Sequence, residues 1–141
     1  MKSPDPTPRR KSEPTPPRGG EPAGPYVVVD VEYVNGAFEI VMTNIGTTPA
    51  FHPRVAFSRR LVGAAGETVI SDLPIWSKLG LLPPGRAIRV FVDAAPLVFQ
   101  RKGSKPFRTT VSYDDDAGRS HKRTYEHDFE AYRDVPQIEN G

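Results

Sequence analysis

The fold is decided by residues 26–43, which read YVVVDVEYVNGAFEIVMT. In residues 26–34, Val27, Val29, Val31 and Tyr33 fall on one face, whereas Asp30 and Glu32 fall on the other with Val28. This period of two is typical of a half-buried strand. The pair Asn35-Gly36 tolerates the positive φ angles of a tight two-residue turn. Residues 37–43 then resume the alternation. The stretch therefore predicts a β-hairpin.

Further segments with the same alternation follow to the end of the chain. They cover residues 50–58, 87–93, 107–113 and 122–132, with a shorter segment at 68–70. Turn residues separate them at the intervals expected of a β-sandwich, and no segment has the helical period that a βαβ unit needs. The sequence therefore predicts an all-β, immunoglobulin-like β-sandwich of about seven antiparallel strands.

Three segments depart from simple alternation. Pro53 interrupts residues 50–58, and since proline donates no hydrogen bond to a ladder, this strand is expected at an edge or bulged there. Residues 73–85 are apolar and rich in proline, and we expect them to carry the chain between sheets and to plug one end of the core. Residues 97–102 are expected to form one helical turn.

Composition divides the chain into three parts. Residues 1–25 hold half of the 16 prolines and almost no large apolar side chain. Such a segment cannot bury enough surface to offset the entropy of ordering, so we expect a disordered, proline-rich, basic tail. We assign residues 26–135 to the sandwich and residues 136–141 to a loose C-terminus.

Charge and cysteine content limit which partners and which cellular compartment we expect. The net charge is +2, and residues 26–141 carry 14 basic and 14 acidic residues, which argues against nucleic acid as the partner. The chain has no cysteine, so it forms no disulfide or thiolate metal site. Because no apolar run could span a membrane or serve as a secretory signal, we expect a cytoplasmic protein.

Two turn motifs carry a resemblance to a known family. The first is Asn44-x-Gly46-x-x-Pro49-Ala50, and the second is LLPPG at residues 81–85. Together they resemble bacterial immunoglobulin-like domains of the CARDB type, the cell-adhesion-related domain found in bacteria. The resemblance covers residues 26–93, apart from a long insertion at residues 59–82. It implies the same fold and an accessory or binding module, and it carries no catalytic residue across.

The candidate catalytic groups are few. His127 has inward parity in its strand and is interpreted as a histidine at the core edge. His121 lies six residues away, too far along a strand to share a metal ion. Asp114–Asp116 is interpreted as a polar hairpin turn, with calcium binding as the alternative. No serine lies in a nucleophile elbow. We therefore expect no enzymatic activity, metal or cofactor.

Two sets of residues are candidate contacts. A protein interface is predicted at Ile75, Trp76, Leu79 and Phe91, and contacts to an anion at Arg101, Lys102, Lys105 and Arg108. Trp76 is the sole tryptophan, and we interpret it as core, with an exposed interface anchor as the alternative. The basic residues are also explained by ordinary solvated surface.

The leading hypothesis is a non-enzymatic protein–protein interaction or assembly module, with another protein as partner. The alternative is an accessory β-sandwich that binds a carbohydrate or another small ligand. Outward-facing Phe91 and Tyr132 are the aromatic residues that would support this alternative. An enzyme that uses the histidines and Asp114–Asp116 is the third hypothesis.

Overall fold

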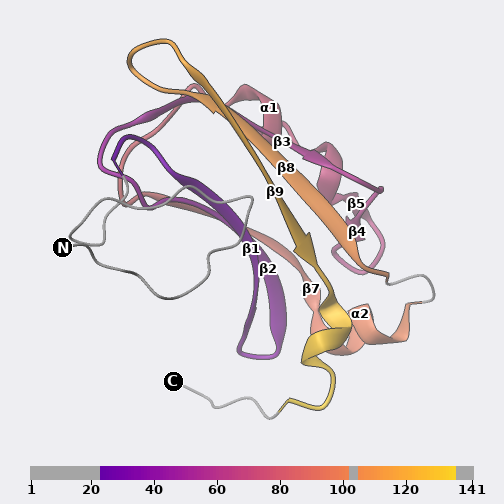
Figure 1. Cartoon of the computed structure of the whole chain (residues 1–141). Coiled ribbons are helices and arrows are strands. Elements are labelled where there is room, and N and C mark those ends of the chain that lie inside the picture. Colours follow the sequence, from indigo (N-terminus) through magenta and orange to yellow (C-terminus); the bar gives the residue numbers. More distant parts are fainter. Residues whose placement is uncertain (1–22, 102–104, 136–141) are drawn as a thin grey trace, which may run out of the picture.

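The computed structural model describes residues 23–101 and 105–135, in which two main antiparallel sheets face each other (Figure 1) and two short strands form a third sheet. The strand order is β1-β2-β7 in one sheet and β6-β3-β8-β9 in the other. The chain changes sheet between β2 and β3, between β6 and β7, and between β7 and β8. This arrangement is the Greek-key pattern of immunoglobulin-like sandwiches, so the predicted fold class is confirmed.

Among the described residues, six strands are eight residues long and three are short. The long strands are β1 (Val27–Val34), β2 (Ala37–Asn44), β3 (Ala50–Phe57), β7 (Ala87–Ala94), β8 (Phe107–Asp114) and β9 (Ser120–His127). The short strands are β4 (Val62–Gly63), β5 (Thr68–Val69) and β6 (Leu81–Leu82). The described residues also form four helical segments: η1 (Ile70–Asp72), α1 (Ile75–Lys78) and α2 (Ala95–Gln100) between strands, and η2 (Phe129–Tyr132) after β9. None of the helices in the described residues is long and apolar enough to cross a membrane.

The first hairpin forms as its sequence predicts. Asn35 and Gly36 have φ angles of 51° and 77°, as a type I′ turn requires. The turn sets the register in which Val29 lies opposite Met42. Both side chains are buried in the core between the two sheets. The alternating apolar residues of 26–43 therefore form the face of this sheet that is buried in the core.

Strand β3 contains the irregularity expected near Pro53. The pairing with β8 shifts between Phe51 and Arg54, and His52 adopts a φ angle of 51°. The bulge turns the ring of Pro53 into the core, where it is fully buried. Strand β3 is not a simple edge, because the two-residue strand β6 pairs with its first residues. The predicted bulge is confirmed.

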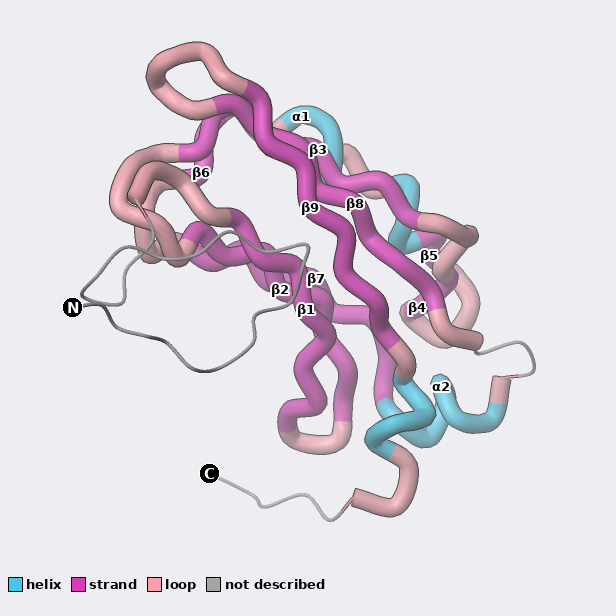
Figure 2. Tube along the Cα trace, viewed as in Figure 1, coloured by secondary structure: helices cyan, strands magenta, loops and turns pink. Residues whose placement is uncertain are grey.

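The apolar segment at residues 73–85 crosses from one sheet to the other only near its C-terminal end. It first forms α1, which packs on β3, and then β6 in the same four-stranded sheet (Figure 2). The crossing to the other sheet occurs after Leu82, where Gly85 N–H donates to Asn44 O at 2.7 Å. The predicted helical turn at residues 97–102 lies two residues earlier, at Ala95–Gln100.

The last strand ends earlier than the sequence predicts, so the predicted end at residue 132 is wrong. Strand β9 stops at His127, and the side chain of Asp128 accepts a hydrogen bond from Glu130 N–H at 3.0 Å, which begins η2. This turn brings the ring of Tyr132 onto Phe38, at a centroid distance of 5.7 Å. Tyr132 is therefore packed against the core, and it does not face outward as a carbohydrate contact.

Residues 1–22 of the predicted tail and the predicted loose end from residue 136 lie outside the described residues. The prediction is wrong for residues 23–25, because Pro25 is buried and Thr47 N–H donates to Gly24 O at 2.8 Å.

Asn44 and Gly46 show why the first turn motif has its spacing. The Asn44 side-chain oxygen accepts hydrogen bonds from Tyr26 N–H at 3.1 Å and Gly46 N–H at 2.9 Å. Its amide nitrogen donates to Thr48 O and Leu82 O, both at 2.9 Å. A Cβ atom at Gly46 would lie 2.1 Å from a main-chain oxygen, so only glycine fits there. The motif is thus a buried junction between the two sheets.

Replacing Asn44 with aspartate should destabilise the protein by about 2–3 kcal/mol. The new carboxylate keeps an acceptor, but its second oxygen faces two carbonyl groups that are left buried without a donor. Urea unfolding at pH 7 measures this effect. The control is Asn35→Asp in the exposed hairpin turn, because Asp-Gly suits the same turn type and should change stability by less than about 0.5 kcal/mol. Equal losses in the two variants would contradict the assigned role of the Asn44 amide.

Candidate interaction site

Trp76 lies in the core and does not supply a surface anchor. Its side chain is 2% exposed, and its indole N–H donates to Ile70 O at 2.7 Å. The ring also packs edge-on against Phe57 at a centroid distance of 5.3 Å. The core interpretation of this residue is confirmed. The alternative, an exposed interface anchor, is wrong because α1 turns the indole towards β3.

The other predicted interface residues do not form one surface with each other. Ile75 and Leu79 are half-buried and pack against the core beside α1. Phe91 is 51% exposed on the outer face of the three-stranded sheet, where it lies opposite Glu39. Arg89 on that face bonds to Glu39 and Glu32 at 3.0 and 2.8 Å, which raises the pKa of the arginine. Phe91 is thus a single aromatic side chain beside a polar network.

The basic residues predicted to contact an anion do not all have free charges. Arg101 pairs with the buried carboxylate of Asp93 and donates to Val62 O at 3.1 Å, so its charge is already used inside the protein. Its assignment as an anion contact is therefore corrected. Lys105 and Arg108 are exposed, and Lys102 lies outside the described residues.

Asp93 is the most completely bonded buried charge in this region. Besides Arg101, it accepts hydrogen bonds from the N–H groups of Ala65 at 2.9 Å and Ala94 at 3.0 Å. Burial raises the pKa of Asp93, but the Arg101 guanidinium and the two N–H groups lower it by more. The carboxylate therefore stays charged at neutral pH and ties the β4–β5 turn to the end of β7.

The acidic cluster builds a hairpin turn. The carboxylate of Asp115 accepts hydrogen bonds from the N–H groups of Ala117 and Arg119, each at 2.9 Å. His121 Nε2 lies 2.9 Å from its other oxygen, and this contact, followed by the N–H groups, lowers the pKa of Asp115 to about 2. In residues 23–101 and 105–135, no group of three or more acidic or histidine side chains is placed to hold a metal ion.

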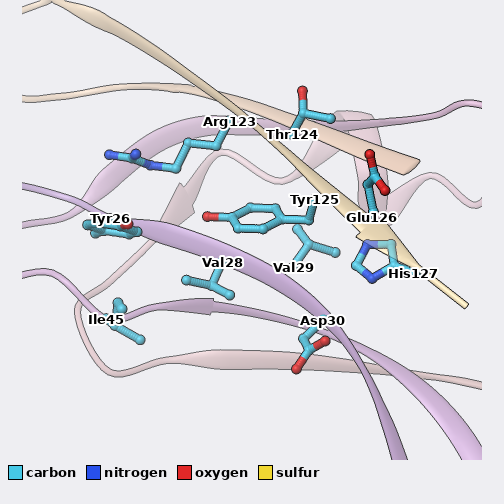
Figure 3. A pocket seen from close by; sticks show the side chains of 10 residues that line it. All are labelled: Tyr26, Val28, Val29, Asp30, Ile45, Arg123, Thr124, Tyr125, Glu126 and His127. Atoms are coloured by element: carbon cyan, nitrogen blue, oxygen red, sulfur yellow. The ribbon is translucent and has the colours of Figure 1, made fainter. Parts of the chain in front are cut away.

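A groove that the sequence did not indicate lies between the edge strands β1 and β9. Its volume is about 450 Å³, and it is open to solvent (Figure 3). Tyr26 and Ile45 lie on one side, and Tyr125 and Thr124 on the other. The guanidinium of Arg123 stacks 3.9 Å from the centre of the Tyr26 ring and spans the upper end. The groove therefore combines aromatic walls with a cation.

His127 lines the groove at the end opposite Arg123 (Figure 3). Its Nε2 lies 2.8 Å from the hydroxyl oxygen of Thr109, and the side chain is buried. Burial lowers the pKa of His127, and the negative charge of Asp30 across the groove only partly offsets this effect. The imidazole is therefore neutral at pH 7, as expected for a histidine at the core edge.

The edge of β1 that faces the groove consists of its odd-numbered residues. Ile45 N–H donates to Tyr26 O at 2.8 Å, and hydrogen-bonded pairs recur every second residue in an antiparallel ladder. Even-numbered residues therefore bond to β2. The N–H and C=O groups of Val27, Val29 and Val31 point away from it.

Tyrosine hydroxyls from β8, β9 and η2 cover this edge. Tyr113 accepts a hydrogen bond from Val27 N–H at 3.3 Å, and Tyr125 donates to Val27 O at 3.1 Å. Tyr132 donates to Val31 O at 3.5 Å. Side chains therefore occupy much of the edge of β1 that a partner strand would need.

The outer edge of β9 is open by contrast. Asp115 N–H donates to Arg119 O at 2.9 Å, so odd-numbered residues of β9 bond to β8. The N–H and C=O groups of Lys122, Thr124 and Glu126 point away from the sheet. Within the described residues, none of these main-chain groups has a hydrogen-bond partner, and the three side chains are exposed. We call these three residues the β9 edge.

Comparison with known proteins gives one family. A model described as a domain of unknown function (DUF8453) matches residues 19–133. No curated protein and no solved structure matches the chain. The matched residues include every strand of the part of the chain that the structure describes, so the groove and the β9 edge both belong to the family domain.

Proposed function

The chain belongs to this domain family of unknown function, and we propose that it is a non-enzymatic interaction module that binds an extended strand of another polypeptide chain. The observation that carries the proposal is the β9 edge, where main-chain donors and acceptors lie in a row without a hydrogen-bond partner in residues 23–101 and 105–135. An extended peptide can satisfy such groups by adding a strand to the sheet. The partner's side chains would then gain specificity from the neighbouring groove.

Charge and composition support a protein partner in the cytoplasm. The 14 basic and 14 acidic residues of 26–141 balance, so the domain offers no net attraction to a phosphate backbone. A chain without cysteine suits a reducing compartment. The resemblance to CARDB-type domains also favours a binding module of bacterial origin.

Photocrosslinking of the full chain tests the proposal. A photoreactive residue at Ser120 on β9 should crosslink a protein from cell lysate, whereas the same residue at exposed Ala87 on the other sheet should not. Adding Thr124→Pro should reduce the crosslinked product at least about tenfold, because proline removes a donor from the edge but is tolerated on an edge strand. The matched control, Thr124→Ala, retains the N–H and should crosslink normally. Crosslinking that survives the proline substitution would exclude strand addition.

Binding of a small ligand in the groove is the second candidate function. A volume of about 450 Å³ lies in the usual range for ligand pockets, and Arg123 and Asp30 offer opposite charges at its rim. Titration with glycans and small anions, followed by the NMR signals of the Tyr26 and Tyr125 rings, distinguishes this function. Selective shifts of these two rings would favour the ligand, and shifts confined to Phe91 would indicate the outer sheet face.

A further inference from the structure

The β9 edge lacks the protection that other edges of the sandwich have. Edge strands are normally bulged, broken by proline, or covered, because an open edge pairs with other chains. Tyrosine hydroxyl groups cover the edge of β1. Strand β3 is flanked by β6 and packs against α1. At β7, Ala64 N–H donates to Val92 O at 2.8 Å. Strand β9 has no proline or glycine and pairs with β8 over all eight residues without a register shift.

We propose that the β9 edge pairs with the same edge of a second copy of this chain. The inference rests on the proposed function and specifies its partner. A two-fold axis at Thr124 would place the free N–H and C=O groups of both copies opposite each other. The two four-stranded sheets would then continue as one sheet across the dimer.

The charges of the β9 edge select this register. With Thr124 opposite the partner's Thr124, Lys122 lies opposite the partner's Glu126, and Glu126 lies opposite the partner's Lys122. Directly opposed residues of an antiparallel pair have Cβ atoms about 4.5–5.5 Å apart, so both ion pairs can form. The lysine, which alone would discourage edge pairing, thus meets its opposite charge.

Neighbouring two-fold registers are less favourable. An axis at Lys122 or at Glu126 places like charges directly opposite each other, and an axis at Arg123 opposes two arginines on the inner face. An axis at Tyr125 pairs Lys122 with the partner's Asp128, whose carboxylate already accepts the hydrogen bond that begins η2. The Thr124 register is therefore the one that pairs both charges of the edge.

Sedimentation equilibrium of the full chain tests the dimer. Measurements should reach about 1 mM, because an interface built on one strand is small and its affinity correspondingly low. The wild type should show a reversible monomer–dimer equilibrium. In the Thr124 register, each of the single substitutions Lys122→Glu and Glu126→Lys places like charges opposite each other at both 122–126 pairs of the dimer. Each should therefore weaken dimerisation at least about tenfold.

Charge reversal supplies matched controls. The double variant Lys122→Glu/Glu126→Lys restores both opposite-charge pairs, and so does an equimolar mixture of the two single variants. Both should dimerise within about threefold of the wild type, the spread that exposed substitutions usually cause. Near-UV circular dichroism checks that every variant is folded. A wild type that is monomeric at about 1 mM, or single variants that dimerise as the wild type does, would overturn the proposal.

The two proposals fail separately. In one outcome the wild type is monomeric, but the crosslinker at Ser120 still captures a different protein and this capture requires the Thr124 N–H. That outcome overturns the second copy as the partner and keeps strand addition as the function. A crosslink between two copies, lost on Thr124→Pro and retained on Thr124→Ala, supports both. A monomer that also gives no Thr124-dependent crosslink overturns both.

Discussion

Replacing Phe38 with alanine should lower the free energy of unfolding by about 4 kcal/mol, because the substitution leaves a large cavity in the core. Phe38 is fully buried. Its ring lies 4.7 Å from that of Phe129 and 4.9 Å from that of Tyr33, measured between centroids. It also meets Phe99 and Tyr132 edge-on at 5.6 and 5.7 Å. One ring therefore joins the first hairpin to α2 and η2.

Phe91→Ala is the matched control for this substitution. Phe91 is on the adjacent strand β7, but its side chain faces solvent, so the same truncation should cost less than about 1 kcal/mol. Urea unfolding followed by fluorescence of Trp76 measures both variants. If the two variants lose similar stability, the cluster around Phe38 does not join these elements.

The long strands could be predicted because their signal is local. A strand with one buried face needs an apolar residue at every second position, and residues 26–43 show this directly. All six eight-residue strands coincide with alternating segments of the sequence. The bulge in β3 was also predictable, because Pro53 lacks the N–H that a regular ladder requires.

The end of β9 could not be placed in the same way. Tyr125, His127 and Phe129 continue the period of two, and Phe129 is indeed buried. The backbone nevertheless changes at Asp128, whose carboxylate accepts the Glu130 N–H and starts a turn. Apolar spacing records which side chains face the core, but it does not record how the backbone brings them there.

The candidate site depends on contacts between distant parts of the chain. The groove forms because β1 and β9 are the outermost strands on one side of the sandwich, and Tyr125 reaches Val27 across it at 3.1 Å. No local pattern gives the strand order. Arg101 illustrates the same limit, because the sequence shows its charge but not the buried carboxylate of Asp93 that it meets.

Replacing Asp93 with alanine should lower the free energy of unfolding by about 3 kcal/mol at pH 7. Removal of one partner from a buried ion pair is strongly destabilising because the other charge loses its compensation. The effect should lie at the lower end of that range, since the Arg101 side chain is 31% exposed and can regain water. The N–H groups of Ala65 and Ala94 also lose their acceptor. Urea unfolding measures the change.

Acid should remove this advantage of the wild type over Asp93→Ala. The folded pKa of Asp93 is lowered, so its stabilising contribution is complete above the unfolded pKa of about 4 and falls as the pH drops towards the folded value. Exposed Asp116 supplies the control, because Asp116→Ala should change stability by less than about 0.5 kcal/mol. Asp93→Asn should retain part of the stability, since its side-chain oxygen can still accept one of the two N–H groups. A gap between wild type and Asp93→Ala that persists unchanged well below pH 4 would mean that the charge of Asp93 does not stabilise the fold, and that its shape alone does.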